Sequence, residues 1–101
     1  MLKLVSHLPV IADPSHAAGC RELAPAFARM AVAANADGML VEVHPEPAVA
    51  WSDGDQSLDL AGLDEMMASL EPWLALRRAT LAQFATNEAV PIELRVCEAA
   101  A

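Results

Sequence analysis

The sequence predicts an α/β fold made of two consecutive βα units. Two short apolar runs, at 8–13 and 39–43, are typical of strands buried in a parallel sheet. Residues 21–34 lie between them and repeat apolar side chains at the spacing of one helical face. Two strands that bracket such a helix form a βαβ unit with a right-handed crossover. Ligands of these units collect at the carboxyl ends of the strands, so functional side chains are expected there.

The first unit is predicted from its turn signals as well as from its apolar run. The string Asp-Pro-Ser-His at 13–16 ends the strand, and we expect residues 17–19 to continue as a loop. The helix is expected to begin near residues 21–23, because Pro25 is tolerated only in a first turn. The apolar face of this helix is made by residues spaced four, three and four apart: Leu23, Phe27, Met30 and Ala34.

The second unit begins with Met-Leu-Val-Glu-Val at 39–43, after helix-stop signals at 35–38. Pro45 and Pro47 end this strand, since two prolines cannot continue a ladder. A polar loop follows at 52–56. The order of elements up to this point is therefore strand, helix, strand.

A second helix is predicted to begin after Asp59, which suits the N-cap position. Its apolar face consists of Leu60, Leu63, Met67, Leu70 and Leu74. Pro72 is expected to kink or restart this helix, which then continues to about Thr86. Residues 91–96 alternate apolar and charged side chains, which favours a half-buried edge strand.

The charge balance argues against two classes of partner. The 101 residues include 6 Lys and Arg against 14 Asp and Glu, a net charge of −8. Nucleic acids and anionic membranes are bound by clustered basic side chains, so neither is an expected partner. No apolar run approaches the roughly 20 residues of a membrane span, and we recognise no secretory signal. Two Cys cannot form a disulfide framework, so the cytoplasm is the expected location.

Three polar residues fall where the carboxyl ends of the strands are expected. His16 follows the first strand, Glu42 lies near the end of the second, and Asp53 lies in the loop beyond it. Neighbouring parallel strands are about 4.7–4.9 Å apart. Their ends can bring His16 and Glu42 together, and the loop can fold Asp53 over them. One imidazole and two carboxylates suit a divalent ion such as Mn, Fe, Co or Zn, or an acid–base set.

Each of these residues also has an ordinary structural interpretation. A histidine after a strand is more often a loop or core residue than a ligand, and Asp53 in Ser-Asp-Gly is a common turn residue. Glu42 is costly to bury without a partner, unless the sheet is exposed at that point. Nearby, His44 could orient Glu42, Cys20 is interpreted as a small buried thiol, and a phosphate could bind near Arg21 where a helix begins.

Three strings of this sequence closely resemble the last two βα units of the 3-deoxy-D-arabino-heptulosonate 7-phosphate (DAHP) synthases, type I-beta branch. They are Leu-Pro-Val-Ile-Ala-Asp-Pro-Ser-His-Ala-Ala-Gly (8–19), Asp-Gly-Met-Leu-Val-Glu-Val-His-Pro-Glu-Pro (37–47) and Trp-Ser-Asp-Gly-Asp-Gln-Ser-Leu (51–58). The related 3-deoxy-octulosonate 8-phosphate (KDO-8-phosphate) synthases share the Glu-x-His-Pro-x-Pro and Ser-Asp elements. The Asp-Pro-Ser-His and Asp-Gly-Asp-Gln-Ser-Leu strings are closer to the heptulosonate enzymes.

The resemblance implies that residues 1–78 are the last two βα units of a (β/α)8 TIM barrel, and so a partial barrel as they stand. Residues 79–101 have no counterpart in the family and are expected to add a helical extension and a possible edge strand. The family is a group of transferases that condense phosphoenolpyruvate with erythrose 4-phosphate. This reaction opens the shikimate route to the aromatic amino acids.

The resemblance also implies a metal site and assigns its residues. His16, Glu42 and Asp53 match the family's metal-binding His, Glu and Asp, which makes them the implied catalytic residues. The cofactor is then a divalent ion (Mn, Co, Fe or Zn), which would hold and polarise the aldehyde carbonyl while the enol carbon attacks.

Parts of the family pattern have no counterpart in this sequence. They are the Cys ligand from the first barrel strand and the Arg and Lys residues that hold the substrate phosphates, so we expect negligible catalysis by the chain alone. Two parallel strands also leave open edges, so we expect self-association or a complementary chain. The alternatives are a non-catalytic assembly or binding module with a partial metal site, and a segment similar to the KDO-8-phosphate synthases.

Overall fold

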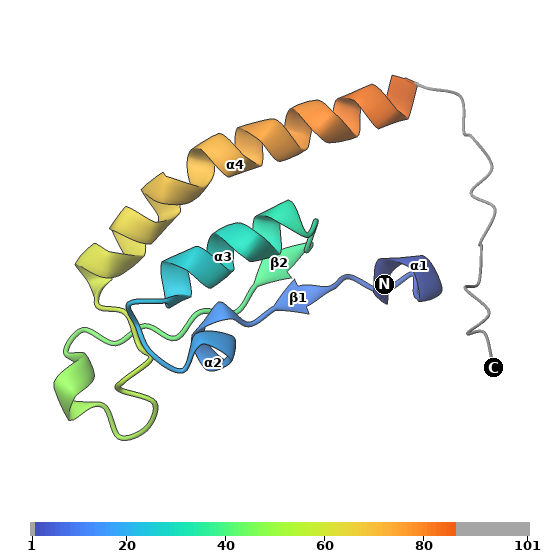
Figure 1. The fold of residues 1–101 in the computed structure, drawn as a ribbon. Helices are drawn as coiled ribbons and strands as arrows, with labels where there is room; N and C mark the ends of the chain where they lie inside the picture. The colour runs from blue at the N-terminus through green and yellow to red at the C-terminus, as the bar shows by residue number, and fades with distance from the viewer. Residues whose placement is uncertain (1, 87–101) are drawn as a thin grey trace, which may run out of the picture.

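The computed structural model describes residues 2–86. Figure 1 shows two short strands, a central helix and a long second helix lying over it. The elements in chain order are α1 (Leu2–Val5), β1 (Ile11–Ala12), α2 (Pro14–Ala18), α3 (Ala24–Ala33), β2 (Gly38–Met39), the 3-10 turn η1 (Pro47–Val49) and α4 (Leu60–Thr86).

The two strands are parallel and adjacent, as the βαβ prediction requires. Ile11 pairs with Gly38 and Ala12 pairs with Met39. The ladder is extended where the N–H of Leu40 donates to the carbonyl of Ala12 over 2.9 Å. Both strands are shorter than the predicted runs, because each has a single neighbouring strand to pair with in the described part of the chain.

A second parallel contact continues this edge further along the chain. Val43 forms an isolated bridge with Leu58, the residue that returns from the loop after η1. The N–H of Leu58 donates to the carbonyl of Glu42 over 3.0 Å, and the N–H of His44 donates to the carbonyl of Leu58 over 2.9 Å. The stretch predicted as a strand at 39–43 is therefore extended chain whose far end pairs with Leu58.

The core lies where α3, α4 and one face of the strands meet. Its buried residues are Ala24, Ala28, Val32, Leu58, Met66 and Leu70. Met39 and Val41 pack against this core from the second strand. Side chains alternate between the two faces of a strand, so Leu40 and Glu42 lie on the opposite face, which no helix covers in the described residues.

The predicted apolar face of α3 is wrong, because the helix buries its alanines instead. Leu23 is 48% exposed and Met30 is 63% exposed, whereas Ala24 and Ala28 are fully buried. Small side chains at the contact allow α4 to approach α3 closely, and the larger side chains project from other sides. The spacing marked a helix correctly but selected the wrong side of it.

Residues 14–18 form a helix rather than the predicted loop. Asp13 caps this helix, since its Oδ1 accepts a hydrogen bond of 3.0 Å from the N–H of His16. Pro14 occupies the first helical position, and Gly19 closes the helix with a left-handed φ of 67°. An Asp followed by Pro is a helix-start signal as well as a turn signal, and here the helix forms.

Helix α4 begins as predicted, with Asp59 as its N-cap. The N–H of Gly62 donates to Oδ1 of Asp59 over 2.6 Å. The helix continues through Pro72 to Thr86 without a restart. Pro72 is exposed, so water can satisfy the backbone carbonyl that loses its partner.

The buried side of α4 differs from the prediction at two positions. Met66 is 1% exposed and Leu70 is fully buried, but Leu60 and Met67 of the predicted face are 60% and 50% exposed.

Helix α4 crosses the predicted boundary between residues 78 and 79, and the predicted strand at 91–96 lies outside the described residues. None of the helices within residues 2–86 has the length and hydropathy needed to cross a membrane.

Candidate metal centre

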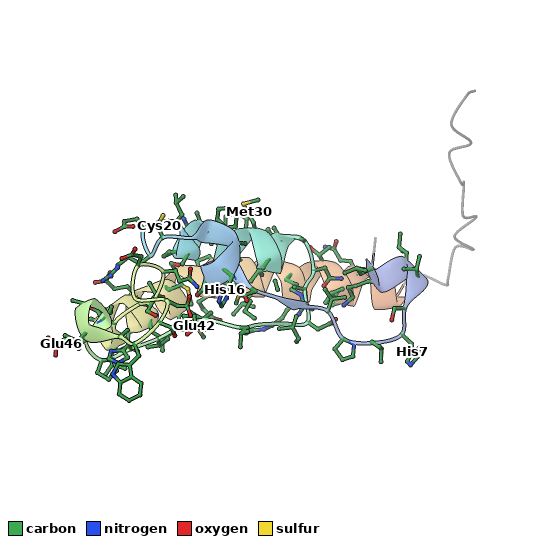
Figure 2. The ribbon with its side chains drawn as sticks, turned by 90° about the horizontal axis from the view of Figure 1, so that it is seen from below. His7, His16, Cys20, Met30, Glu42 and Glu46 are labelled. Atoms are coloured by element: carbon green, nitrogen blue, oxygen red, sulfur yellow. The ribbon has the colours of Figure 1, made fainter. Side chains whose placement is uncertain are left out.

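His16, Glu42 and Asp53 converge at one end of the strand pair. Each offers one possible ligand atom, and these atoms all lie within 4.8 Å of one another. Figure 2 shows His16 and Glu42 close together, while His7 lies at the opposite end of the molecule. The grouping predicted from the positions of these residues after the strands is the grouping that the fold produces.

His16 is held in a defined orientation by Asp13. The ring nitrogen Nδ1 of His16 lies 2.8 Å from Oδ2 of Asp13, while the other carboxylate oxygen accepts from the His16 backbone N–H. The remaining ring nitrogen, Nε2, is therefore the one available to a ligand. These two hydrogen bonds, the backbone one foremost, lower the pKa of Asp13 below its ordinary value.

Glu42 is half-buried and is fixed through its backbone. Its N–H donates to the hydroxyl of Ser15 over 2.9 Å, and Ser15 is fully buried. Its carbonyl accepts from the N–H of Leu58. The sequence left open whether Glu42 is buried or exposed, and the structure places it between these extremes. The uncovered face of the strand leaves its carboxylate partly open to solvent.

Asp53 begins a tight turn that continues through residues 54–56. Its φ of 57° is left-handed, a conformation that Asp and Asn adopt more readily than other non-glycine residues. The carbonyl of Asp53 accepts from the N–H of Ser57 over 3.0 Å and from the hydroxyl of Ser57 over 2.8 Å. The next residue must be glycine, since a Cβ on Gly54 would lie 2.4 Å from the carbonyl oxygen of Pro47.

The donor set fits a divalent cation. Nitrogen and carboxylate oxygen donors suit borderline to hard ions. Among residues 2–86, the ion pairs formed by Lys and Arg involve Asp37 and Glu71, and none involves Glu42 or Asp53. Two carboxylates that share a site without a cation repel each other, so a bound cation would relieve this repulsion. The Nδ1 contact of His16 with a carboxylate is also the usual support of a metal-binding histidine.

The other residues singled out from the sequence have different roles. Nδ1 of His44 accepts from the backbone N–H of Glu46 over 3.0 Å, so this nitrogen is not directed at Glu42. Cys20 is half-buried with a free thiol. Arg21 is committed to hydrogen bonds with the loop that holds Asp53.

Two residues that shape the site were not predicted. Asp13 could have been found from its spacing, because a helix-capping residue three positions before a histidine can reach both the backbone and the ring. Ser15 could not, since its partner is a backbone N–H that lies 27 residues further along the chain. No pattern in the sequence reports a contact of that kind.

A cavity of about 360 Å³ opens beside Glu42. It is also lined by His44 and Trp51, and the indole of Trp51 is fully exposed at its edge. The half-buried carboxylate of Glu42 is therefore reachable from solvent. A small molecule could approach Glu42 from this side.

Comparison with known proteins gives concordant matches. The sequence profile of the DAHP synthetase I family matches residues 1–74. The phospho-2-dehydro-3-deoxyheptonate aldolase of Thermotoga maritima is 45% identical over 71 residues, which make up 70% of this chain and 21% of the relative. The 2-dehydro-3-deoxyphosphooctonate aldolase of Desulfosudis oleivorans is 38% identical over 86 residues, covering 74% of this chain and 30% of the relative.

Solved structures agree with these matches. The crystal structure of DAHP synthase from Thermotoga maritima gives a TM-score of 0.68 at 46% identity, over 71% of this chain and 22% of that one. A truncated form of 3-deoxy-D-arabino-heptulosonate 7-phosphate synthase from the same organism gives 0.59 at 42% identity, over 77% and 28%. This chain spans about a fifth to a third of the length of the two aldolases from Thermotoga maritima and Desulfosudis oleivorans that it matches in sequence.

Proposed function

The chain belongs to the DAHP synthetase I family, and from this we propose that it carries the metal-binding end of a DAHP synthase active site. The observation that supports this most directly is the convergence of His16, Glu42 and Asp53 within 4.8 Å. The proposed reaction is the aldol-type condensation of phosphoenolpyruvate with erythrose 4-phosphate, the first step of the shikimate pathway to aromatic amino acids.

In this proposal each residue has a separate task. Nε2 of His16 and the carboxylates of Glu42 and Asp53 hold a divalent ion (Mn, Co, Fe or Zn) at the carboxyl ends of the strands. A bound ion of this kind supplies Lewis-acid polarisation of the aldehyde carbonyl. Asp13 keeps the proton of His16 on Nδ1, which leaves Nε2 as a lone-pair donor.

The proposed architecture is a (β/α)8 barrel of which this chain forms the last two βα units. The helix-free face of the strands carries exposed apolar side chains, with Ile11 at 60% and Leu40 at 55% exposure. In a closed barrel this face packs against the side chains of the other strands. We propose that polypeptide outside these 101 residues supplies those strands, and that a complementary chain or self-association can do so.

The same reasoning leads us to expect negligible synthase activity from the isolated chain. Residues that hold the two substrate phosphates are needed to position the reacting carbons, and the family's phosphate-binding Arg and Lys residues have no counterpart in this sequence. Incubation of the purified chain with both substrates and Mn²⁺ should give no product. Product formation by the chain alone would show that the site is more complete than proposed.

A second candidate function is supported by the similarity to the octonate aldolases. The octonate aldolase of Desulfosudis oleivorans is 38% identical to this chain over 86 residues. Phosphoenolpyruvate contributes three carbons, so a C8 product requires a five-carbon aldose phosphate where a C7 product requires a four-carbon one. Once the barrel is complete, comparison of these two aldehyde substrates distinguishes the candidates.

A non-catalytic module is the third possibility, and metal titration tests it together with the main proposal. Calorimetric titration of the purified chain with Mn²⁺ and Zn²⁺ should show binding that disappears in Glu42→Ala. Glu46→Ala is the matched control, because Glu46 is exposed and lies outside the converging group. Absence of binding, or binding that Glu42→Ala leaves unchanged, would contradict the proposed metal site and favour an assembly module.

The cysteine content fits a reducing compartment, and we place the protein in the cytoplasm on this ground. Cys20 is a free thiol in the structure. Disulfides are the usual state of paired cysteines in oxidising compartments. Thiol titration of the native protein with a chromogenic reagent would test whether both cysteines are reduced.

A further inference from the structure

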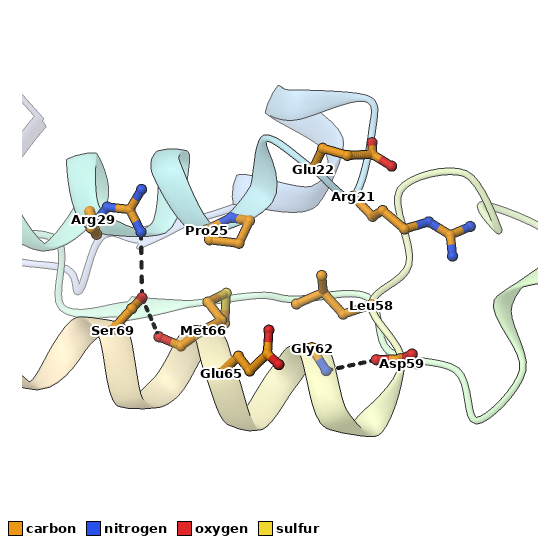
Figure 3. A pocket seen from close by; sticks show the side chains of 10 residues that line it. All are labelled: Arg21, Glu22, Pro25, Arg29, Leu58, Asp59, Gly62, Glu65, Met66 and Ser69. Carbon is orange, nitrogen blue, oxygen red and sulfur yellow. Dashed lines mark hydrogen bonds between the residues drawn. The ribbon is translucent and has the colours of Figure 1, made fainter.

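We propose that Arg21 is a positioning residue that fixes the loop carrying Asp53. This inference rests on the proposed metal function of Asp53. Arg21 lies between α2 and α3, immediately before the central helix, and is half-buried. In Figure 3 its side chain extends away from α3 toward the loop that precedes α4.

Arg21 holds this loop at two adjacent points. Its Nη2 donates to the carbonyl of Gly54 over 2.8 Å, and its backbone N–H donates to the carbonyl of Asp55 over 2.9 Å. Both hydrogen bonds tie the loop to the preceding βα unit. A guanidinium is a permanently charged donor, so its bond to a carbonyl is stronger than one between neutral groups.

The loop needs an external attachment to place Asp53 reproducibly. Asp53 is exposed, and its turn is closed by hydrogen bonds to its own neighbours, Gln56 and Ser57. Those bonds set the shape of the turn, and the pairing of Leu58 with Glu42 ties the end of the loop to the second strand. Neither set of bonds ties the loop to the segment that carries His16. Surface loops without contacts to the rest of the fold are the most mobile parts of a protein, and Arg21 provides such contacts.

All three converging residues are held by one connecting segment, residues 13–21. Asp13 orients the ring of His16, and Ser15 accepts a hydrogen bond from the backbone of Glu42. Arg21 completes the set by holding the residues next to Asp53. The connection between β1 and α3 therefore determines the relative positions of residues that come from three different parts of the chain.

A positioning role and a purely electrostatic role of Arg21 predict opposite changes in metal affinity when Arg21 is removed. A cation near a metal site opposes binding of a second cation, so removal of its charge should strengthen Mn²⁺ binding by Coulomb's law. A positioning role predicts the reverse, because a loop that is no longer fixed presents Asp53 less often in the binding geometry. Weaker binding in Arg21→Ala therefore cannot arise from the lost charge.

The test is a calorimetric Mn²⁺ titration of the full chain and its variants. Arg21→Ala should weaken binding by about tenfold or more, the range for supporting residues around metal ligands. Arg21→Lys keeps the charge but not the fork of donors and should also weaken binding. Arg78→Ala is the matched control, since Arg78 is exposed on α4 and forms one surface ion pair with Glu71.

A double-mutant cycle shows whether Arg21 acts through Asp53. In the Asp53→Ala background, Arg21→Ala should cause little further loss of affinity. An equal loss in both backgrounds, or unchanged or tighter binding in Arg21→Ala itself, would overturn the proposal. If the parent chain binds no Mn²⁺, the proposed metal function fails, and hydrogen exchange then decides the role of Arg21 separately.

Hydrogen exchange gives this second readout in the absence of metal. The amides of Gln56 and Ser57 donate within the Asp53 turn and report its stability. Arg21→Ala and Arg21→Lys should speed their exchange, while helix-core amides near Leu70 keep their rates. Unchanged exchange at Gln56 and Ser57 in both variants would overturn the proposal whatever the metal data show.

Discussion

The backbone N–H of Glu42 donates a hydrogen bond to the buried hydroxyl of Ser15, a residue that lies 27 positions earlier in the chain. Ser15 directly precedes His16. The bond therefore joins the segment that carries His16 to the extended chain that carries Glu42, just beyond the last residues of the β1–β2 ladder. The distance between the side chains of His16 and Glu42 is therefore set by this hydrogen bond as well as by strand pairing.

Ser15→Ala should lower the free energy of unfolding by about 1–3 kcal/mol, the cost of leaving a buried donor without a partner. Urea unfolding followed by circular dichroism would measure it. Ser69→Ala is a suitable control, because Ser69 is half-buried and its hydroxyl donates to the carbonyl of Met66. Its other partner is the guanidinium of Arg29 over 3.5 Å, so no backbone N–H loses its acceptor. Equal losses in the two variants would contradict the interpretation.

Asp13→Asn should weaken Mn²⁺ binding by about 10–100-fold, because the neutral amide no longer supports the ring of His16 as a carboxylate does. Asn can still cap α2, so the fold should be kept. Calorimetric titration measures the change, with Asp64→Asn on the exposed side of α4 as the charge-matched control. An affinity equal to that of the parent chain would show that the contact between Asp13 and His16 has no supporting role.

Asn35 ends the central helix with a φ of 63°, and its Oδ1 accepts a hydrogen bond of 2.9 Å from Nε of Arg77 on α4. Asn35→Ala loses this bond and keeps a strained backbone, whereas Asn35→Gly loses the bond but relaxes the backbone. The alanine variant should therefore be the less stable of the two by about 1 kcal/mol. Thermal melts of both variants test the ranking, and a more stable alanine variant would refute it.

Asp37 gives the fold a pH dependence at acidic pH. A hydrogen bond from Lys3, and a second from the N–H of Val10, lower the pKa of Asp37 in the folded chain below 3.8. The stability that Asp37 contributes is present above 3.8, its unfolded value, and is lost as the pH falls through the folded pKa.

Asp37→Asn should therefore melt at a lower temperature than the parent chain at neutral pH, with a gap that closes as the pH falls below 3.8. Melting curves across this range test the prediction. Asp64→Asn again serves as the control and should show no such gap. A gap that stays constant with pH would mean that the ionisation of Asp37 is not involved.

The fold could be predicted where local signals and burial agree. The parallel pair follows from two apolar runs that flank a helix, and Asp59 identifies the start of α4 because a capping side chain acts on its own backbone. The buried sides of the helices could not be predicted in this way. The predicted faces were drawn mainly through the larger apolar side chains. The contact of α3 with α4 instead buries small side chains such as Ala24 and Ala28.

The candidate site shows the same division. His16, Glu42 and Asp53 could be grouped because the topology places residues that follow parallel strands at one edge. The residues that hold them could be predicted only in part. Asp13 acts over three positions, but Ser15 and Arg21 act on backbone groups far along the chain. Every residue type supplies a backbone carbonyl, and every type except proline supplies a backbone N–H.

Trp51 gives the candidate site an optical signal of its own. Its indole is fully exposed at the edge of the cavity beside Glu42, so its emission should have the long wavelength of an indole in water. A polypeptide that closes over this end of the strands would cover the ring and move the emission to shorter wavelength. Assembly could then be followed in dilute solution without a label, and Trp51→Phe would remove the signal while Trp73 on α4 remained as an internal reference.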